Sequence, residues 1–431
     1  MLASPACARD IALGVLDRLS RRQRSAEREQ RQGTKLNLLN RTLKAAIAPC
    51  DTWVSCRRAA PAREMTPRPP SRRSEVEGRI AMTKSVTKSA LSLITFGAVL
   101  ALLQGTPAQA LNTKSYVSNT GSDANDCSSV ALACAGLQHA HDQTSPGGEV
   151  SVVSPGDYSG LNSSVAARLI IQKSIHITND GVGEASIRTP GLNLGIAILI
   201  QPSLGAIVSV RGLVIDGVGV GLIGIDIMTP SAVHIQNCVV RNFQSFRGWG
   251  VTLLHGINTQ LFISDSIIFN NGSDAFSGGI QIAPVNIPNI SGSSDAKVVL
   301  DRVHLENNVI GVLVDGQISR EGQQGVTKSA YVIIRDSVVS GNASDGIRAI
   351  TTAVNSPAFL FVERTTVVNN AVTGILANGP GATMLLNDNT VTRNGVGISA
   401  INSGQLISFG NNRNANNVGP EGAPTGFFSQ M

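Results

Sequence analysis

Seven segments of the chain share one eleven-residue pattern, in which Val, Ile and Leu alternate with polar residues. They are VSVRGLVIDGV from Val208, VHIQNCVVRNF from Val233, LFISDSIIFNN from Leu261, VVLDRVHLENN from Val298, VIIRDSVVSGN from Val332, LFVERTTVVNN from Leu360 and MLLNDNTVTRN from Met384. A degraded eighth copy begins at Leu406. Alternation at period two in runs this short predicts strands rather than helices. Successive copies start 22 to 37 residues apart, which is typical of a solenoid.

Two residue types mark the corners of each repeat. A glycine opens a third apolar segment after each copy, at Gly224, Gly250, Gly279, Gly311, Gly346, Gly374 and Gly397. An asparagine recurs where the second strand should end, at Asn242, Asn271, Asn308, Asn342, Asn370 and Asn394. Both types tolerate left-handed backbone, and Asn side chains bond to backbone in tight turns. We therefore expect three strands per coil and a hydrogen-bonded asparagine ladder along one corner.

Coils of this kind stack as parallel strands around a continuous Val, Ile and Leu core. Over roughly residues 112 to 425 the pattern resembles the right-handed parallel β-helix of the pectate lyase superfold. The fold class expected is all-β, a right-handed parallel β-helix solenoid of about ten coils with an N-terminal helical cap. That superfold carries lyases, hydrolases, esterases, epimerases and non-enzymatic adhesins, so the resemblance indicates a fold and leaves the function open.

Positive charge is concentrated at the front of the chain. Residues 1–81 hold 17 Lys+Arg against 8 Asp+Glu, whereas the remaining residues hold 18 against 21. A nucleic-acid partner inferred from the overall pI near 9.2 would rest on the first 81 residues alone, and we predict none. Two interpretations of residues 1–81 stay open, a mis-assigned upstream reading with Met82 as the true start and a genuine disordered basic leader.

Residues 82–110 have the layout of a secretory signal peptide. A basic start is followed by an apolar stretch from Ala90 to Leu103 and a small-x-small ending at Ala110. The apolar stretch is too short for a membrane span. We expect cleavage near Ala110 and a secreted or periplasmic protein.

The mature chain is expected to contain a cap at residues 111–148, the parallel β-helix at residues 149–425 and a C-terminal tail at residues 426–431. A cap is needed because an open terminal coil exposes unpaired backbone groups. Cys127 and Cys134 are predicted to form a small disulfide loop in an oxidising compartment.

One outer face carries the candidate chemistry. Positions one and three of each repeat are apolar and point inward, so position four, which holds Asp301, Arg335 and Glu363 on successive coils, points outward. Insertions at residues 283–297, 315–331 and 351–359 lead into the strands that carry these residues. The resemblance implies a cleft along this strand. We expect these residues to hold an acidic or hydroxylated sugar by charge-assisted bonds, with Asp301 or Glu363 as acid or base and Arg335 mattering most for an acidic ligand.

Three further residues are predicted to contact a ligand. Arg320 and Glu321 lie in the second insertion, and Trp249 lies in an enlarged turn as an exposed aromatic. The alternatives are structural. Opposite charges on neighbouring strands form a stabilising ladder worth about 0.2–1 kcal/mol per pair, and Trp249 packs over its own turn.

The active-site motifs of characterised pectate lyases and polygalacturonases are absent from the sequence. No metal-ligand spacing occurs and no cofactor is identified; calcium stays open without its Gly-Gly-x-Gly-x-Asp motif. We expect an exported monomer that binds, and in one hypothesis cleaves as a lyase or hydrolase, a polysaccharide or cell-surface glycan. The alternative is a non-catalytic surface adhesin or structural rod.

Overall fold

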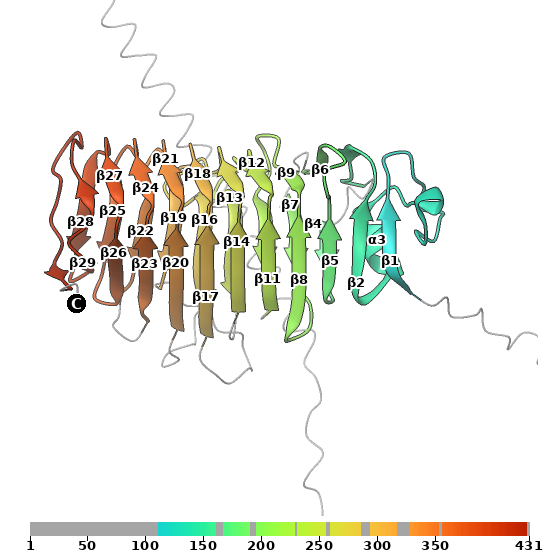
Figure 1. Cartoon of the computed structure of the whole chain (residues 1–431), viewed down its shortest axis with the longest axis horizontal. Helices are drawn as coiled ribbons and strands as arrows, with labels where there is room; N and C mark the ends of the chain where they lie inside the picture. Colours follow the sequence, from blue (N-terminus) through green and yellow to red (C-terminus); the bar gives the residue numbers. More distant parts are fainter. Residues whose placement is uncertain are drawn as a thin grey trace, which may run out of the picture. The chain divides into compact units, whose positions relative to one another are not determined.

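The computed structural model describes residues 111–160, 167–189, 195–228, 231–255, 259–285, 294–316, 328–352 and 356–428. The predicted leader and signal peptide lie outside these residues. Within them the chain winds through three parallel sheets, A, B and C, as Figure 1 shows. The predicted right-handed parallel β-helix is confirmed, with 12, 10 and 9 strands in its sheets.

Sheet A contains β1 (Asn112–Val117), β2 (Thr144–Val152), β5 (Ile175–Thr178), β8 (Ala206–Arg211), β11 (Ser231–Gln236), β14 (Thr259–Ser264), β17 (Ser294–Asp301), β20 (Lys328–Arg335), β23 (Ala358–Glu363), β26 (Ala382–Asn387), β29 (Gln405–Ser408) and β31 (Gly426–Phe427). Sheet B contains β3 (Gly156–Asp157), β6 (Ala185–Arg188), β9 (Leu213–Asp216), β12 (Val239–Arg241), β15 (Ile267–Phe269), β18 (His304–Glu306), β21 (Val338–Ser340), β24 (Thr366–Val368), β27 (Thr390–Thr392) and β30 (Arg413–Asn414). Sheet C contains β4 (Ala167–Ile171), β7 (Ile196–Ile200), β10 (Ile223–Ile227), β13 (Trp249–His255), β16 (Gly278–Val285), β19 (Ile310–Asp315), β22 (Ile347–Ile350), β25 (Thr373–Asn378) and β28 (Val396–Ile401).

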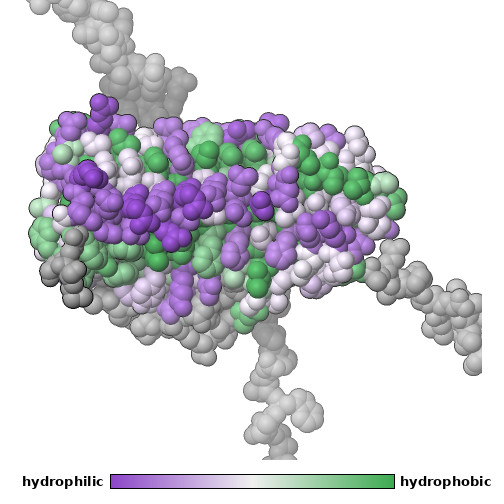
Figure 2. Space-filling view, in the orientation of Figure 1, coloured by the Kyte–Doolittle hydropathy of each residue, from purple (hydrophilic) through white to green (hydrophobic). Residues whose placement is uncertain are grey.

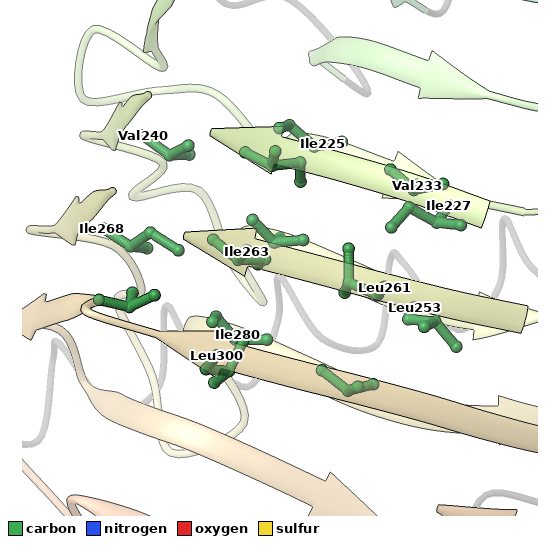
Figure 3. Packing of buried hydrophobic residues seen from close by; sticks show 14 of the residues in the cluster. Ile225, Ile227, Val233, Val240, Leu253, Leu261, Ile263, Ile268, Ile280 and Leu300 are labelled. Carbon is green, nitrogen blue, oxygen red and sulfur yellow. The ribbon is translucent and has the colours of Figure 1, made fainter. Parts of the chain in front are cut away.

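The core is a continuous stack of aliphatic side chains from all three sheets. Figure 3 shows part of it, with Leu261 and Ile263 from sheet A, Ile268 from sheet B and Ile280 from sheet C pointing inward together. Positions one and three of the repeat are buried in every coil, as the alternation predicts. Each fully buried aliphatic side chain contributes about 1.5–3 kcal/mol, so the stack as a whole holds the coils together.

The asparagine ladder forms at the corner between sheets B and C. Asn342 Nδ2 donates to Asn370 Oδ1 at 2.7 Å, and Asn370 Nδ2 donates to Asn394 Oδ1 at 2.8 Å. The same pattern continues at both ends, to Asn271 and Asn308 on one side and to Asn417 on the other. These side chains are nearly or fully buried along most of the ladder and replace water as partners for corner backbone groups.

Asn242 does not belong to this ladder, contrary to the prediction. Phe243 takes the ladder position in that coil, and its backbone N–H donates to Asn271 Oδ1 at 3.1 Å. Asn242 lies one residue earlier, in left-handed backbone with φ of 64°. Its side chain turns outward to Asp216 Oδ1 at 3.0 Å, so asparagine serves two different roles at this corner.

The N-terminal end of the solenoid is closed by a short helix, as predicted. Helix α3 (Leu137–Gln143) packs against β1, β2 and β4, with Leu137 and Ala140 buried, and a 3-10 turn η1 (Val130–Leu132) precedes it. Cys127 and Cys134 form a disulfide with Cα atoms 5.1 Å apart, which confirms the predicted pairing. No helix of the described residues is long and apolar enough to cross a membrane.

Thiol labelling of the folded protein should modify none of the three cysteines described here. Cys127 and Cys134 are joined, while Cys238 is fully buried, and burial raises the pKa of its thiol to about 11. A buried, protonated thiol does not react with alkylating reagents. After denaturation without reductant, mass spectrometry should find Cys238 labelled and Cys127 and Cys134 unlabelled. Recovery of Cys127 or Cys134 as a labelled free thiol would rule the disulfide out.

Candidate functional site

The three predicted site residues lie on the outer face of sheet A, at the ends of three successive strands. Asp301, Arg335 and Glu363 pair directly in the strand register. Arg335 Nε and Nη2 lie 3.2 and 3.3 Å from the two carboxylate oxygens of Asp301. Glu363 instead contacts Arg364 at 2.8 Å and accepts a hydrogen bond from Asn387 Nδ2 at 2.9 Å. The structure thus brings the three residues together, with each carboxylate already paired.

A second row of charges, which we did not predict, lies beside them at the corner between sheets A and B. Position five of the repeat alternates in sign along five successive coils: Asp265, Arg302, Asp336, Arg364 and Asp388. All five adopt left-handed backbone with φ between 44° and 54°. This turn points their side chains outward next to position four. The alternation is visible in the aligned repeats and was the available signal.

The two rows form three neighbouring groups of ion pairs. Arg302 binds both carboxylate oxygens of Asp265, at 2.7 and 3.1 Å, and also Asp301 at 2.7 Å. Arg364 binds both oxygens of Asp336, at 2.7 and 2.9 Å. Arg413 lies 3.6 Å from Asp388 at the C-terminal end. We call the three groups together the charged strip; it comprises Asp265, Asp301, Arg302, Arg335, Asp336, Glu363, Arg364, Asp388 and Arg413.

Pairing stabilises the charged forms of four position-five side chains, Asp265, Arg302, Asp336 and Arg364. Hydrogen bonds from Arg302 hold the pKa of Asp265 below its usual value, and those from Arg364 do the same for the pKa of Asp336. The same contacts raise the pKa of both guanidinium groups. Asp265, Arg302, Asp336 and Arg364 therefore stay ionised at neutral pH. The arginines of these pairs are about half exposed or more, so solvent screens the pairs and they contribute little to stability.

An apolar band runs alongside the charged strip on the same face. It consists of the position-two side chains of six successive coils, Phe262, Val299, Ile333, Phe361, Leu385 and Ile407. Ile333 is 39% exposed, and the adjacent Tyr331 is 47% exposed. Figure 2 shows the hydrophilic strip in purple across the C-terminal half of this face, with hydrophobic surface in green beside it.

Of the other predicted contact residues, Trp249 is corrected by the structure. It is only 3% exposed, because it packs on the outer side of sheet C against Ile310 and Leu313. Phe246, three residues earlier, is the exposed ring at 72%. Arg320 and Glu321 lie outside the described residues, as do parts of all three inserted loops.

The described residues do not fit a calcium site on this face. Calcium needs six to eight oxygen ligands, several of them free carboxylates. Every carboxylate of the charged strip already has an arginine partner. Among the described residues, the only cluster with metal-ligand spacing comprises Cys127, Cys134 and His139, and both cysteines are in the disulfide.

Comparison with known proteins agrees with this architecture. A crystal structure of pectate lyase Pel9A superposes with a TM-score of 0.52 at 13% identity, covering 74% of this chain and 80% of that one. The chain has a pectate lyase-like right-handed parallel β-helix fold. ORF18 of Geobacillus virus E2 matches with a TM-score of 0.41 at 16% identity, covering 78% of this chain and 64% of that one. No protein-family model matches the chain, and no curated protein matches it in sequence.

Such a likeness shows the fold alone, because one β-helix supports many activities. On this pectate lyase-like fold, the charged strip and the apolar band run side by side on the outer face of sheet A. Together they make a continuous surface with a polar side and an apolar side, extending over successive coils.

Proposed function

We propose that this protein is exported and binds a polysaccharide along the outer face of sheet A. The observation that carries the proposal is the parallel course of the apolar band and the charged strip over the same coils. An extended sugar chain presents apolar ring faces and polar hydroxyl edges, so it can contact both at once. Export is supported by the signal-peptide pattern at residues 82–110 and by the disulfide, which persists in oxidising compartments.

Catalysis by Asp301, Arg335 and Glu363 stays a prediction. A general acid must carry a proton near neutral pH and a general base must reach its substrate freely. Asp301 is 9% exposed and is bound by both Arg302 and Arg335, and Glu363 is bound by Arg364. This pairing favours the second candidate function, a non-catalytic glycan-binding or adhesive protein, over a lyase or hydrolase.

The triple variant Asp301→Ala/Arg335→Ala/Glu363→Ala tests the proposed site. We expect it to fold, because the buried Asp301 is removed together with its partner Arg335, and Arg302 keeps Asp265 as a partner. We expect it to bind polysaccharide at least about tenfold more weakly, because the central part of the charged strip is removed. Retention on immobilised polysaccharides and release of soluble sugar would be measured alongside the melting temperature.

A variant at the N-terminal end of the same sheet, Lys114→Ala/Glu149→Ala, is the matched control, since it removes a comparable exposed ion pair of 3.2 Å. It should bind as the unmodified protein does. If the triple variant binds fully and only melts slightly lower, the charged strip is a structural ladder and this part of the face is not the site. Loss of sugar release with binding retained would establish catalysis.

A further inference from the structure

We infer that the polysaccharide bound by this face is uncharged and not a polymer of uronic acids. This inference rests on the proposed function and names the class of its ligand. It follows from how the charges and rings of the face are already engaged.

The cations of the charged strip are occupied by the protein's own carboxylates. Arg302 and Arg364 each use three nitrogens on two carboxylates. Arg335 uses two nitrogens on Asp301. A uronate that approached these arginines would have to displace a bidentate partner already in place, or share the guanidinium with it.

The overall charge of the strip also gives no attraction for an anionic polymer. Its five carboxylates face four guanidinium groups, a formal charge of −1. Binding of a polyanion usually needs a continuous patch of unpaired cations. Alternating signs along successive coils cancel the field within a few ångströms, where salt also screens it.

The strip can still hydrogen-bond neutral hydroxyl groups. The side chains of Arg302, Arg335 and Arg364 are 55%, 46% and 46% exposed, so their outer edges face solvent. A guanidinium has five N–H groups, and Arg335 uses only two nitrogens on Asp301. Hydroxyl oxygens can accept the remaining bonds without breaking any ion pair.

Aromatic rings supply the apolar contact that an uncharged chain needs. Phe361 and Phe409 lie 6.2 Å apart between ring centroids, and Phe409 and Phe428 lie 5.4 Å apart. On the other side of the band, Tyr331 and Phe359 lie 6.3 Å apart. Rings of this kind bury large apolar area with little loss of conformational freedom, which suits the flat faces of neutral sugar rings.

The test is retention of the purified protein on insoluble or immobilised polysaccharides of both classes. Xylan, mannan and β-glucan represent the neutral class, and polygalacturonate and alginate represent the uronate class. We expect retention on at least one neutral polymer and on neither uronate polymer. Raising the salt from about 20 mM to about 200 mM should change the retained fraction less than about twofold, because no counterions are released.

Two aromatic variants and one matched control locate the contact. Phe361→Ala and Tyr331→Ala should each weaken retention about tenfold. Phe246→Ala removes a more exposed ring from the turn between sheets B and C and should leave retention unchanged. Tyr331 is exposed at the surface, so its variant keeps the test valid even if the half-buried Phe361 proves necessary for folding.

The possible outcomes separate the two proposals. Retention on uronate polymers alone, with strong salt dependence, would overturn the inference while the proposed function stands. Retention of both the Phe361→Ala and Tyr331→Ala variants at the level of the unmodified protein would also overturn it. Retention on no polymer of either class would overturn the proposed function itself.

Discussion

Ile334→Asp is expected to leave no folded protein at room temperature. Ile334 is fully buried on β20, and its register partners on the neighbouring coils, Leu300 and Val362, are also fully buried. An aspartate there would place an unpaired charge among aliphatic side chains, or a protonated acid without a hydrogen-bond partner. Either cost is several kcal/mol and is comparable with the whole stability of a typical domain, about 5–15 kcal/mol. Circular dichroism and thermal melting of the purified variant would show the loss.

Arg335→Ala is the matched control, one residue further along the same strand. Its side chain points to the outer face and loses only the half-exposed pair with Asp301, which keeps Arg302 as a partner. We expect a change of under about 1 kcal/mol in the free energy of unfolding. If both variants fold equally well, the inward and outward positions of this strand have been assigned the wrong way round.

The alternation of the sequence was sufficient to predict the fold and the direction of these side chains. A slip of one residue would turn every Val, Ile and Leu of a strand to solvent, so burial fixes the register strongly. For the same reason, the pairing of Asp301 with Arg335 and Glu363 on successive coils followed directly from the aligned repeats.

Corners were harder to predict, because they lack the alternation of apolar and polar residues that marks a strand. Asn242 has the residue type of the ladder but lies one position early, and Phe243 replaces the ladder asparagine in that coil. The charges at Arg302 and Asp336 were overlooked because the left-handed turn that points them outward is a property of the corner and not of a strand. The sequence contained their alternation in sign, but only the turn geometry shows that it continues the outer face.

Trp249 shows a different limit. Its position in an enlarged turn suggested that the ring is exposed. Its register partner on the next coil is Gly278, which has no side chain. Trp249 lies on the outer side of sheet C and contacts Ile310 and Leu313. Which outer-face residues of sheet C are covered depends on neighbouring coils, and a single strand pattern does not contain that information.

Asn370→Ala is expected to lower the free energy of unfolding by about 3 kcal/mol or more. Asn370 Oδ1 accepts hydrogen bonds from the backbone N–H and side chain of Asn342, at 3.2 and 2.7 Å. Its Nδ2 donates to Val339 O and to Asn394 Oδ1, at 3.2 and 2.8 Å. Alanine would leave at least two of these groups buried without a partner, at about 1–3 kcal/mol each.

Asn378→Ala, eight residues later on β25, is the control. It separates the contribution of the ladder to the free energy of unfolding from the general cost of removing an asparagine. Asn378 is half-buried, and its side chain accepts one hydrogen bond, from Asn402 Nδ2 at 2.8 Å at the surface. Water can replace that donor, so the expected loss is within about 0.5–1 kcal/mol. Urea unfolding of both variants at one temperature gives the comparison. Similar midpoints for the two would mean that the buried ladder adds no more stability than an exposed amide, and that aliphatic packing alone holds successive coils in register.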